Sequence, residues 1–466
     1  MPRIELEAGN GTAIVDQVVD GIAALIDSHR LPAGRKLPSI RAFAVANGIS
    51  KSTVVDAFDR LVARGLLASR HKVGFFVVGP RPAFDLAERV PRAEREIDPL
   101  WSLRQWLQAG PEILKPGCGH LPEEWMDGEG VRQSLRAVAR SPQARLLDYG
   151  RPRGFAPLRA HLQGVFAERG IDAQPAQIML TDGALHAVDL TCRLLVQPGD
   201  TVFVDDPGYF NYVAQLAVHR AQVVGVPYGD GGPDLEAFAE LAARHRPRLY
   251  ITNAAIHNPT GATLSPAVAH RLLKLAEQQD FIILEDDIYA DFEDRKAPRL
   301  AALDQLDRVV YVGSFSKSLS AASRCGWIAA RPDWVDGLAD IKLACAVAGN
   351  ELSAQMVHRM LTEGGYRKHM EGVRHQLRAA SVDVRRRLER LGMDVPIVPP
   401  GGMFLWAKLP DGLDSAAVAR AAFARGIAMA PGNVFSVSRS AGRYLRFNIP
   451  HSGHQRIWDF LKEALA

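Results

Sequence analysis

The stretch Tyr311–Trp327, YVGSFSKSLSAASRCGW, places one lysine, Lys317, in a run of serines, and an arginine, Arg324, follows seven residues later. The apolar residues before Ser314 are typical of a β-strand. A lysine in a serine-rich turn is usually only solvated by water. The alternative is a lysine that forms a Schiff base, with the neighbouring hydroxyls and the arginine holding a phosphate. The rest of the chain has to decide between these two interpretations.

Strand-like apolar runs alternate with helical patterns from about Ile113 onward. The strand candidates are QIMLT, DTVFVDDP, RLYITN, FIILEDD and RVVYVGSFSK, and helical segments such as SPAVAHRLLKLAEQQ separate them. Repeated strand–helix units predict an α/β domain with a large, mainly parallel sheet. Because ligands bind beyond the carboxyl ends of parallel strands, we expect the polar residues after these strands to converge on one site.

Each predicted strand is followed by a turn with polar or aromatic residues. In chain order these turns contain Asp182-Gly183-Ala184, Tyr209, Asn258 within HNPTG, Asp286 and Tyr289, and Ser314, Ser316 and Lys317. Taken singly each is weak evidence, since an aspartate after a strand is more often a helix N-cap than a catalytic group. Five such turns in this order, with a lysine in the last, favour the chemistry of pyridoxal 5'-phosphate (PLP).

PLP chemistry explains why these residue types occur together. We assign the aldehyde-binding amine to Lys317 and the carboxylate that keeps the pyridine nitrogen protonated to Asp286. With Tyr289, which donates to the phenolate oxygen as Asn258 does, these form the predicted catalytic set. Tyr209 is expected to stack on the ring. The predicted phosphate contacts are Ser314, Ser316, Arg324 and the backbone amides of Gly183 and Ala184.

The motifs HNPTG, DDIY and SFSK…SRCGW resemble the class I and II aminotransferases of fold-type I, over roughly Ile113–Ala466. The resemblance implies a PLP-binding fold with a smaller C-terminal α+β domain over about 335–466. It also implies that Tyr149, in YGRPRG, reaches the phosphate of the neighbouring subunit's cofactor. Arg446, in YLRFNIP, would bind the substrate α-carboxylate, with Asn258 as a second substrate contact. The alternatives are a core aromatic for Tyr149 and a surface ion pair for Arg446.

The N-terminal part of the chain is basic and has the pattern of a DNA-binding module. Between Ser28 and Val78 there are nine Lys and Arg residues against two aspartates. Helical patterns cover Thr12–Ser28, IRAFAVANG after Ser39, and KSTVVDAFDRLVARG after Ser50, whose predicted buried stripe is Val54, Phe58, Leu61 and Val62. Two short helices joined at a glycine predict a helix-turn-helix, and LLASRHKVGFFVVG predicts a hairpin or wing.

Small hydroxyls and a cation at the start of the third helix can meet phosphates and base edges in the major groove. The predicted DNA contacts are Arg41, Ser50, Lys51, Ser52, Thr53, Arg70, His71 and Lys72. The alternative is a small helical dimerisation module with a solvated basic face. The LPSxR turn, the SKSTV helix start and the RLxxxGLL end resemble the winged helix-turn-helix of the GntR family of bacterial regulators. The wing departs from the family form and keeps only Gly74.

The predicted domains are a winged helix-turn-helix over 1–78, a Pro-rich charged linker over 79–112 and a PLP-binding domain over 113–466. This combination resembles the MocR subgroup of GntR regulators. The resemblance implies a homodimer, operator DNA with repeated half-sites, and a response to PLP or to an amino acid or amine that joins it. The alternatives are an active aminotransferase that carries a DNA-binding domain and a protein that holds PLP itself as the signal.

Composition limits the other possibilities. A chain of 466 residues with 47% hydrophobic residues fits two or three domains with packed cores. The four cysteines form no Cys-x-x-Cys pair and no cluster with zinc spacing, so we expect no metal site and a reducing cytoplasm. No apolar run reaches the length of a membrane span, and the N-terminus lacks a signal-peptide pattern.

Overall fold

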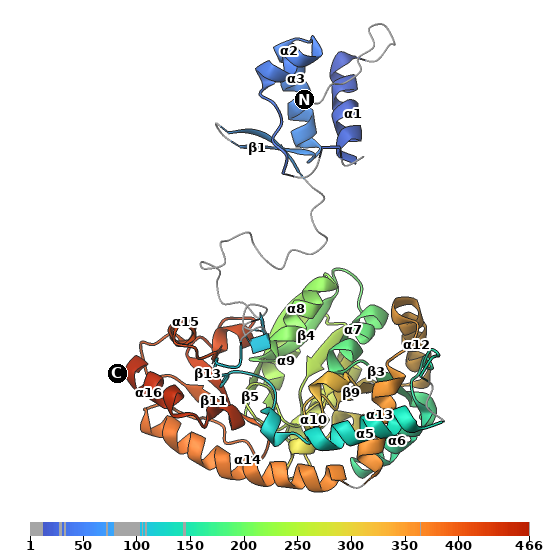
Figure 1. The fold of residues 1–466 in the computed structure, drawn as a ribbon, viewed down its shortest axis with the longest axis vertical. Helices are drawn as coiled ribbons and strands as arrows, with labels where there is room; N and C mark the ends of the chain where they lie inside the picture. Colours follow the sequence, from blue (N-terminus) through green and yellow to red (C-terminus); the bar gives the residue numbers. More distant parts are fainter. Residues whose placement is uncertain are drawn as a thin grey trace. The chain divides into compact units, whose positions relative to one another are not determined.

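The computed structural model divides the chain into two compact units, Met1–Val90 and Pro91–Ala466, and each is described by itself (Figure 1). The predicted linker lies mostly outside the described residues. None of the helices within the described ranges is long and apolar enough to cross a membrane. The described residues are 13–27, 30–31, 34–70, 73–78, 103–104, 106–107, 110–142, 146–363 and 365–465.

The first unit contains the predicted helices and hairpin. The helices are α1 (Ile14–Asp27), α2 (Ile40–Asn47) and α3 (Lys51–Ala63), and β1 (Leu67–Arg70) pairs antiparallel with β2 (Gly74–Val77). The Ser39 side chain accepts from the amide of Ala42 at the start of α2, and Gly48 ends that helix at φ 64°. A left-handed residue at this place is what glycine allows, and it sets the turn between α2 and α3. The winged helix-turn-helix is therefore confirmed.

A small core holds this unit together. It contains Val18, Ile22, Phe43, Val54, Phe58 and Leu61, all nearly inaccessible. Of the predicted stripe on α3, Val62 is only half-buried, and Ala57 takes the core position instead. This correction has a geometric reason, because Ala57, Leu61 and Val54 share the side of α3 that faces α1, whereas Val62 lies at its edge.

The second unit is built on an eight-stranded sheet with the order β3-β10-β9-β8-β7-β4-β5-β6. The strands are β3 (Ile178–Thr181), β4 (Thr201–Asp206), β5 (Gln222–Gly229), β6 (Gly232–Pro233), β7 (Leu249–Thr252), β8 (Ile282–Asp286), β9 (Val309–Ser314) and β10 (Gly326–Ala329). Strands β5, β4, β7, β8 and β9 run parallel, whereas β10 is antiparallel to both its neighbours. The predicted mainly parallel sheet is confirmed, with β10 and β6 as the antiparallel exceptions.

Helices cover both faces of this sheet, which explains why its strands are continuous apolar runs. On one face lie α7 (Ala184–Leu195), α8 (Phe210–Val218) and α12 (Pro332–Ala346). On the other lie α6 (Ala156–Glu168), α9 (Leu235–His245), α10 (Pro266–Gln279), α11 (Leu300–Asp304) and α13 (Glu351–Thr362), with α5 (Gly128–Arg140) against α13. The two hydrophobic cores are thus separated by the sheet itself.

A third hydrophobic core lies toward the C-terminus, around a smaller sheet. Its sheet is β11 (Phe404–Lys408), β13 (Tyr444–Asn448) and β12 (Ala430–Pro431), and its helices are α14 (Gly365–Arg390), α15 (Ser415–Ala424) and α16 (Gln455–Ala464). An early segment joins it, because Leu114 and Gly117 donate backbone hydrogen bonds to Gly426 and Ala428. This contact brings residues 114–121 to the border between the C-terminal core and the large sheet, next to the carboxyl ends of its strands.

Candidate functional site

Residues that follow separate strands of the large sheet line a single cavity at its carboxyl edge. The lining residues are Ala184, Leu185, Tyr209, Asn253, Asn258, Asp286, Ile288, Tyr289, Ser316, Lys317 and Arg324. The structure thus brings together most of the residues predicted for the PLP site. Ser314 and Gly183 lie directly behind this lining, whereas Asn253 and Ile288 line it without having been predicted.

Lys317 follows β9 and reaches across the cavity to the early segment. Its Nζ donates to the backbone oxygen of Gly119 at 2.6 Å. Burial, and then the nearby charge of Arg446, lowers the pKa of Lys317 to about 8. With this pKa about half of the Lys317 amine is neutral at about pH 8, and a neutral amine is the form that attacks a carbonyl.

Asp286 ends β8 with its carboxylate fixed on both sides. Tyr212, from α8, donates its hydroxyl to Asp286 Oδ2 at 2.6 Å, and the amide of Ile288 donates to Oδ1 at 3.0 Å. Burial raises the pKa of Asp286 to about 6. A buried carboxylate whose charge is costly gains most from a cation placed against it. The arrangement therefore fits a protonated pyridine nitrogen, and Tyr212 is a contributor that the sequence did not suggest.

A polar cradle lies at the start of α7. Arg324 donates from Nη1 to Ser316 Oγ at 3.1 Å and from Nη2 to the Asp182 backbone oxygen at 2.8 Å. The Ser314 and Ser316 hydroxyls are 2.9 Å apart. Gly183 has a φ of 97°, and a Cβ there would stand 2.5 Å from the Arg324 guanidinium. The glycine keeps the space open before the first-turn amides of α7, which is the geometry of an anion site.

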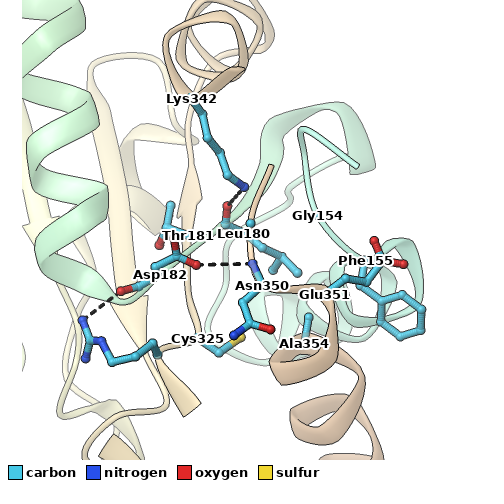
Figure 2. A pocket seen from close by; sticks show the side chains of 12 residues that line it. Gly154, Phe155, Leu180, Thr181, Asp182, Cys325, Lys342, Asn350, Glu351 and Ala354 are labelled. Carbon is cyan, nitrogen blue, oxygen red and sulfur yellow. Dashed lines mark hydrogen bonds between the residues drawn. The ribbon is translucent and has the colours of Figure 1, made fainter. Parts of the chain in front are cut away.

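The side chain of Asp182 turns away from this cradle (Figure 2). One carboxylate oxygen lies 3.4 Å from His186 Nδ1, and the other accepts from the amide of Asn350 at 3.5 Å. His186 lowers the pKa of Asp182, mainly through the hydrogen bond between them. Only the backbone oxygen of Asp182 meets Arg324, so its negative side chain does not compete with a phosphate.

Behind Asp182 lies a lysine, Lys342 of α12, whose side chain is fully buried. Its Nζ donates to the backbone oxygens of Leu180 at 2.9 Å and Pro152 at 3.0 Å (Figure 2 shows the first). The amine thus joins the end of β3 to the loop that carries Tyr149. Nothing in the local sequence of α12 marks this lysine, because both its partners are distant in the chain.

Arg446, on β13, is one of the largest fully buried side chains among the described residues and is 2% exposed. It donates to Asn258 Oδ1 and to the Gly117 backbone oxygen, both at 2.7 Å. Its guanidinium carbon lies 4.2 Å from the centre of the Phe404 ring. Among the described residues no carboxylate pairs with it, and burial lowers its pKa. The predicted alternative of a surface ion pair does not fit this environment.

Tyr289 and Tyr209 complete the cavity, whereas Tyr149 stays outside it. Asn258 Nδ2 donates to the Tyr289 hydroxyl at 3.4 Å, and the Tyr209 ring packs edge-on against Tyr212. Tyr149 is 74% exposed, so within this chain it is neither a core aromatic nor a cavity residue. Its exposure leaves it available to another molecule.

Four of the eight residues predicted to meet DNA lie at the start of α3. Ser50, Lys51 and Ser52 are exposed, Thr53 is half-exposed, and Arg41 projects from α2. Ser50 caps the helix by accepting from the Thr53 amide at 3.0 Å. Arg70 lies at the end of β1, where its side chain is outside the described residues, and His71 and Lys72 are outside them altogether.

Some basic residues of this unit form ion pairs with carboxylates, and others do not. Arg60 pairs with Asp16 and Asp56, both at 2.9 Å, and so ties α3 to α1. Arg41 and Lys51 form no ion pair within the described part of the unit. Their charge is therefore available to a polyanion, while that of Arg60 is largely neutralised.

Comparisons with known proteins agree with both units. The family "Aminotransferase class I and II" matches residues 126–458, and "Bacterial regulatory proteins, gntR family" matches residues 14–77. Regulator TauR of Rhodobacter capsulatus is 30% identical, over 88% of this chain and 86% of that protein. The "Probable rhizopine catabolism regulatory protein MocR" of Rhizobium meliloti is 28% identical, over 77% and 73% respectively.

A solved structure resembles the second unit. LysN, the alpha-aminoadipate aminotransferase of Thermus thermophilus in complex with N-(5'-phosphopyridoxyl)-L-leucine, is 27% identical with a TM-score of 0.71. The match covers 78% of this chain and 94% of the LysN chain.

The cradle opened by Gly183, the buried Asp286 carboxylate and the Lys317 amine fit the phosphate, the ring nitrogen and the aldehyde of PLP, respectively. The chain therefore belongs to the class I and II aminotransferase family and, through its gntR domain, to the MocR subgroup of bacterial regulators, which makes it a DNA-binding regulator with a PLP domain.

Proposed function

We propose that this regulator senses an amino acid, or a related amine, that reaches the PLP held in its second unit. Bound PLP supplies an aldehyde with which a primary amine condenses and a ring that withdraws electrons. The observation that carries the proposal is Arg446, a buried guanidinium without an acidic partner among the described residues. A buried cation that lacks an anion is costly, and the α-carboxylate of an amino acid would relieve this cost.

The other residues of the cavity have distinct roles in this proposal. Lys317 would hold the cofactor through Nζ, at the same aldehyde with which the amine of the ligand would react. Asp286, oriented by Tyr212, keeps the ring nitrogen protonated, and the hydroxyl of Tyr289 donates to the ring oxygen. Asn258 links two of these groups, because it accepts from Arg446 and donates to Tyr289. A carboxylate bound at Arg446 therefore competes with Asn258 and changes its contact with Tyr289.

The output of the sensor is DNA binding by the unit at 1–78, tethered through 79–112 to the PLP domain at 113–466. We propose a homodimer in which the exposed Tyr149 contacts the cofactor phosphate of the partner, as in the fold-type I family. Two helix-turn-helix units then meet two half-sites of an operator. Ligand binding changes operator affinity only if the ligand has different affinities for two states of the dimer.

A titration of the purified, PLP-loaded protein tests this function. Amino acids are added singly while the cofactor spectrum and the affinity for a selected operator fragment are followed. We expect one amino acid to shift the spectrum and change the operator affinity, and the matching amine without a carboxylate to do neither. No sequence-specific DNA binding under any condition, with or without PLP, would exclude a regulator.

The second candidate function is an active aminotransferase that carries a DNA-binding unit. It is favoured by the presence of Lys317, Asp286 and Tyr289 in one cavity, with Arg446 bonded to the lining residue Asn258. Adding 2-oxo acids after the amino acid distinguishes the two functions. Sustained turnover that is lost in Lys317→Ala would establish the enzyme, whereas a spectrum that shifts once and stops would establish the sensor.

The pH dependence of PLP capture tests the environment of Lys317. Because the neutral amine is the reactive form and its pKa is about 8, capture of added PLP by the cofactor-free protein should speed up as the pH rises through 8 and then level off. An ordinary lysine, with a pKa of about 10.4, would keep gaining up to about pH 10. Stopped-flow absorbance measures the rate, and a rate that still rises between about pH 9 and 10 would contradict a buried, shifted amine.

Replacement of Lys51 tests the DNA-binding surface. Lys51→Ala should weaken binding to the operator fragment and lower the slope of log affinity against log salt by about 1, since one phosphate contact is lost. Fluorescence anisotropy at several salt concentrations gives the slope. Arg64→Ala is the matched control, because Arg64 is a cation at the opposite end of the helix, 3.5 Å from Asp20. An unchanged slope in Lys51→Ala would remove Lys51 from the contacts.

A further inference from the structure

Three metal-ligating side chains meet beside the PLP cavity. The sulfur of Cys118 and ring nitrogens of His120 and His451 all lie within 4.8 Å of one another. Two of them come from the early segment and the third follows β13. The sequence suggested no metal site because His451 is contributed by the far end of the chain, so no ligand spacing is visible.

The cluster is held in place by one buried amide. Asn448, which is fully buried, donates from its NH2 group to the backbone oxygens of Cys118 at 3.1 Å and of His120 at 2.8 Å. The same group lies 3.6 Å from the Cys118 sulfur, and Asn448 Oδ1 accepts from the backbone amide of His451 at 3.4 Å. One side chain therefore fixes the backbone of all three residues, as second-layer groups do around metal ligands.

Few hydrogen bonds would compete with a metal ion for the Cys118 sulfur and for His451 Nε2. His451 Nε2 is buried without a hydrogen-bond partner in the described structure. The two imidazole rings meet edge to face with centres 5.4 Å apart. The sulfur makes only weak contacts, 3.6–3.7 Å long.

We propose that Cys118, His120 and His451 form a Zn²⁺ site with three protein ligands at the mouth of the PLP cavity. A thiolate with two imidazoles is a ligand set that suits Zn²⁺ among the common divalent ions. The Cys118 thiol loses its proton to solvent when the ion binds, so affinity rises with pH. Both histidines line the same open cavity as Lys317, so a fourth position on the ion faces the space through which a ligand approaches.

The site is coupled to the PLP cavity through a single residue. Gly119, between two of the ligands, supplies the backbone oxygen that accepts from Lys317 Nζ. A bound ion fixes residues 118–120 and with them this acceptor. Binding of the ion does not require that the PLP domain senses amino acids, so the two proposals can be tested separately.

Binding of Zn²⁺ to the PLP-loaded full-length chain tests the site directly. The protein is reduced, dialysed against chelator and titrated with ZnCl2 by calorimetry in a phosphate-free buffer. We expect one ion per chain in wild type. Cys118→Ser and His451→Ala should each weaken binding by at least about 10-fold, since even second-layer changes have effects of that size. Titration with Co²⁺ should give a thiolate-to-metal absorption band that is lost in Cys118→Ser.

Two matched variants control for other cysteines and histidines. Cys345→Ser removes the exposed thiol, and His270→Ala removes an exposed imidazole on α10, so both should bind Zn²⁺ like wild type. If Cys118→Ser fails to fold, as judged by its cofactor spectrum, His120→Ala replaces it, because His120 is only half-buried. The site is rejected if wild type binds no Zn²⁺, if the ligand variants bind like wild type, or if Co²⁺ shows no thiolate band.

Discussion

Replacing Lys317 with alanine is expected to abolish the visible absorption band of lysine-bound PLP completely, while the chain keeps its fold. The first effect follows because, among the described residues, Lys317 is the one lysine that lines the cavity with Tyr209, Asp286 and Tyr289. The second follows because Lys317 Nζ makes one described hydrogen bond, to the backbone oxygen of Gly119. Losing this partly solvated contact costs about 1 kcal/mol, which a domain of this size tolerates.

The measurement is an absorption spectrum of the protein after incubation with PLP and removal of the excess by gel filtration. Lys274→Ala is the matched control, since Lys274 is an exposed lysine on α10 of the same unit. We expect the control to keep the band. Lys317→Arg tests whether a positive charge at position 317 is enough, because arginine keeps a cation there but does not condense with an aldehyde. This variant should also lack the band. A band that survives in Lys317→Ala would mean that another lysine binds the cofactor.

The same variant separates the two units functionally. The helix-turn-helix has its own core, so Lys317→Ala should still bind the operator fragment with the salt dependence of wild type. What it should lose is the change in operator affinity on addition of the amino acid. If the response to the amino acid persists without the lysine-bound cofactor, the effector binds elsewhere and the proposed sensing mechanism is wrong.

The elements that could be predicted from the sequence are those encoded by short-range patterns. Four strands of the large sheet are apolar runs of 4–6 residues that end in a polar turn, as β4 and β8 show. Parallel strands bring such turns to one edge, so the order of strands and turns along the chain is enough to group Asp286, Asn258 and Lys317. The caps Ser39 and Ser50 likewise marked the starts of α2 and α3 within one residue.

The features that escaped prediction depend on contacts between distant parts of the chain. Tyr212 lies on an ordinary amphipathic helix, and only the pairing of β4 with β7 and of β7 with β8 brings it to Asp286. Only eleven residues, which include the lysine turn, separate β9 from β10, and β10 returns antiparallel. A regular alternation of strands and helices does not predict such a return. The role suggested for Arg446 came from family resemblance alone, and its burial beside Asn258 gives that role its physical basis.

Lys342 is the clearest case of a residue whose importance is visible only in the structure, and its loss should have the largest effect on stability. Lys342→Ala is expected to lower the free energy of unfolding of the second unit by about 3–5 kcal/mol. The variant leaves the backbone oxygens of Pro152 and Leu180 without their donor and opens a void next to the small cavity of Figure 2. Buried carbonyls without partners and voids of this size each cost energy in a packed interior.

Urea unfolding followed by the fluorescence of buried tryptophans such as Trp327 gives the stability of this unit. The control is again Lys274→Ala, which removes the same side chain at an exposed site and should change stability by less than about 0.5 kcal/mol. Hydrogen exchange adds a local measurement. Peptides that cover residues 149–154 should exchange faster in Lys342→Ala, because the amine that ties this loop to β3 is gone.

Lys342→Met distinguishes the two causes of the loss. Methionine keeps most of the volume of the lysine stem but donates no hydrogen bond, so it fills the void and leaves the two carbonyls unpaired. We expect it to recover part of the stability and to remain about 1–3 kcal/mol below wild type. It should also keep fast exchange in the Tyr149 loop. A methionine variant as stable as wild type, with slow exchange there, would show that Lys342 only fills space and does not position the loop that carries Tyr149.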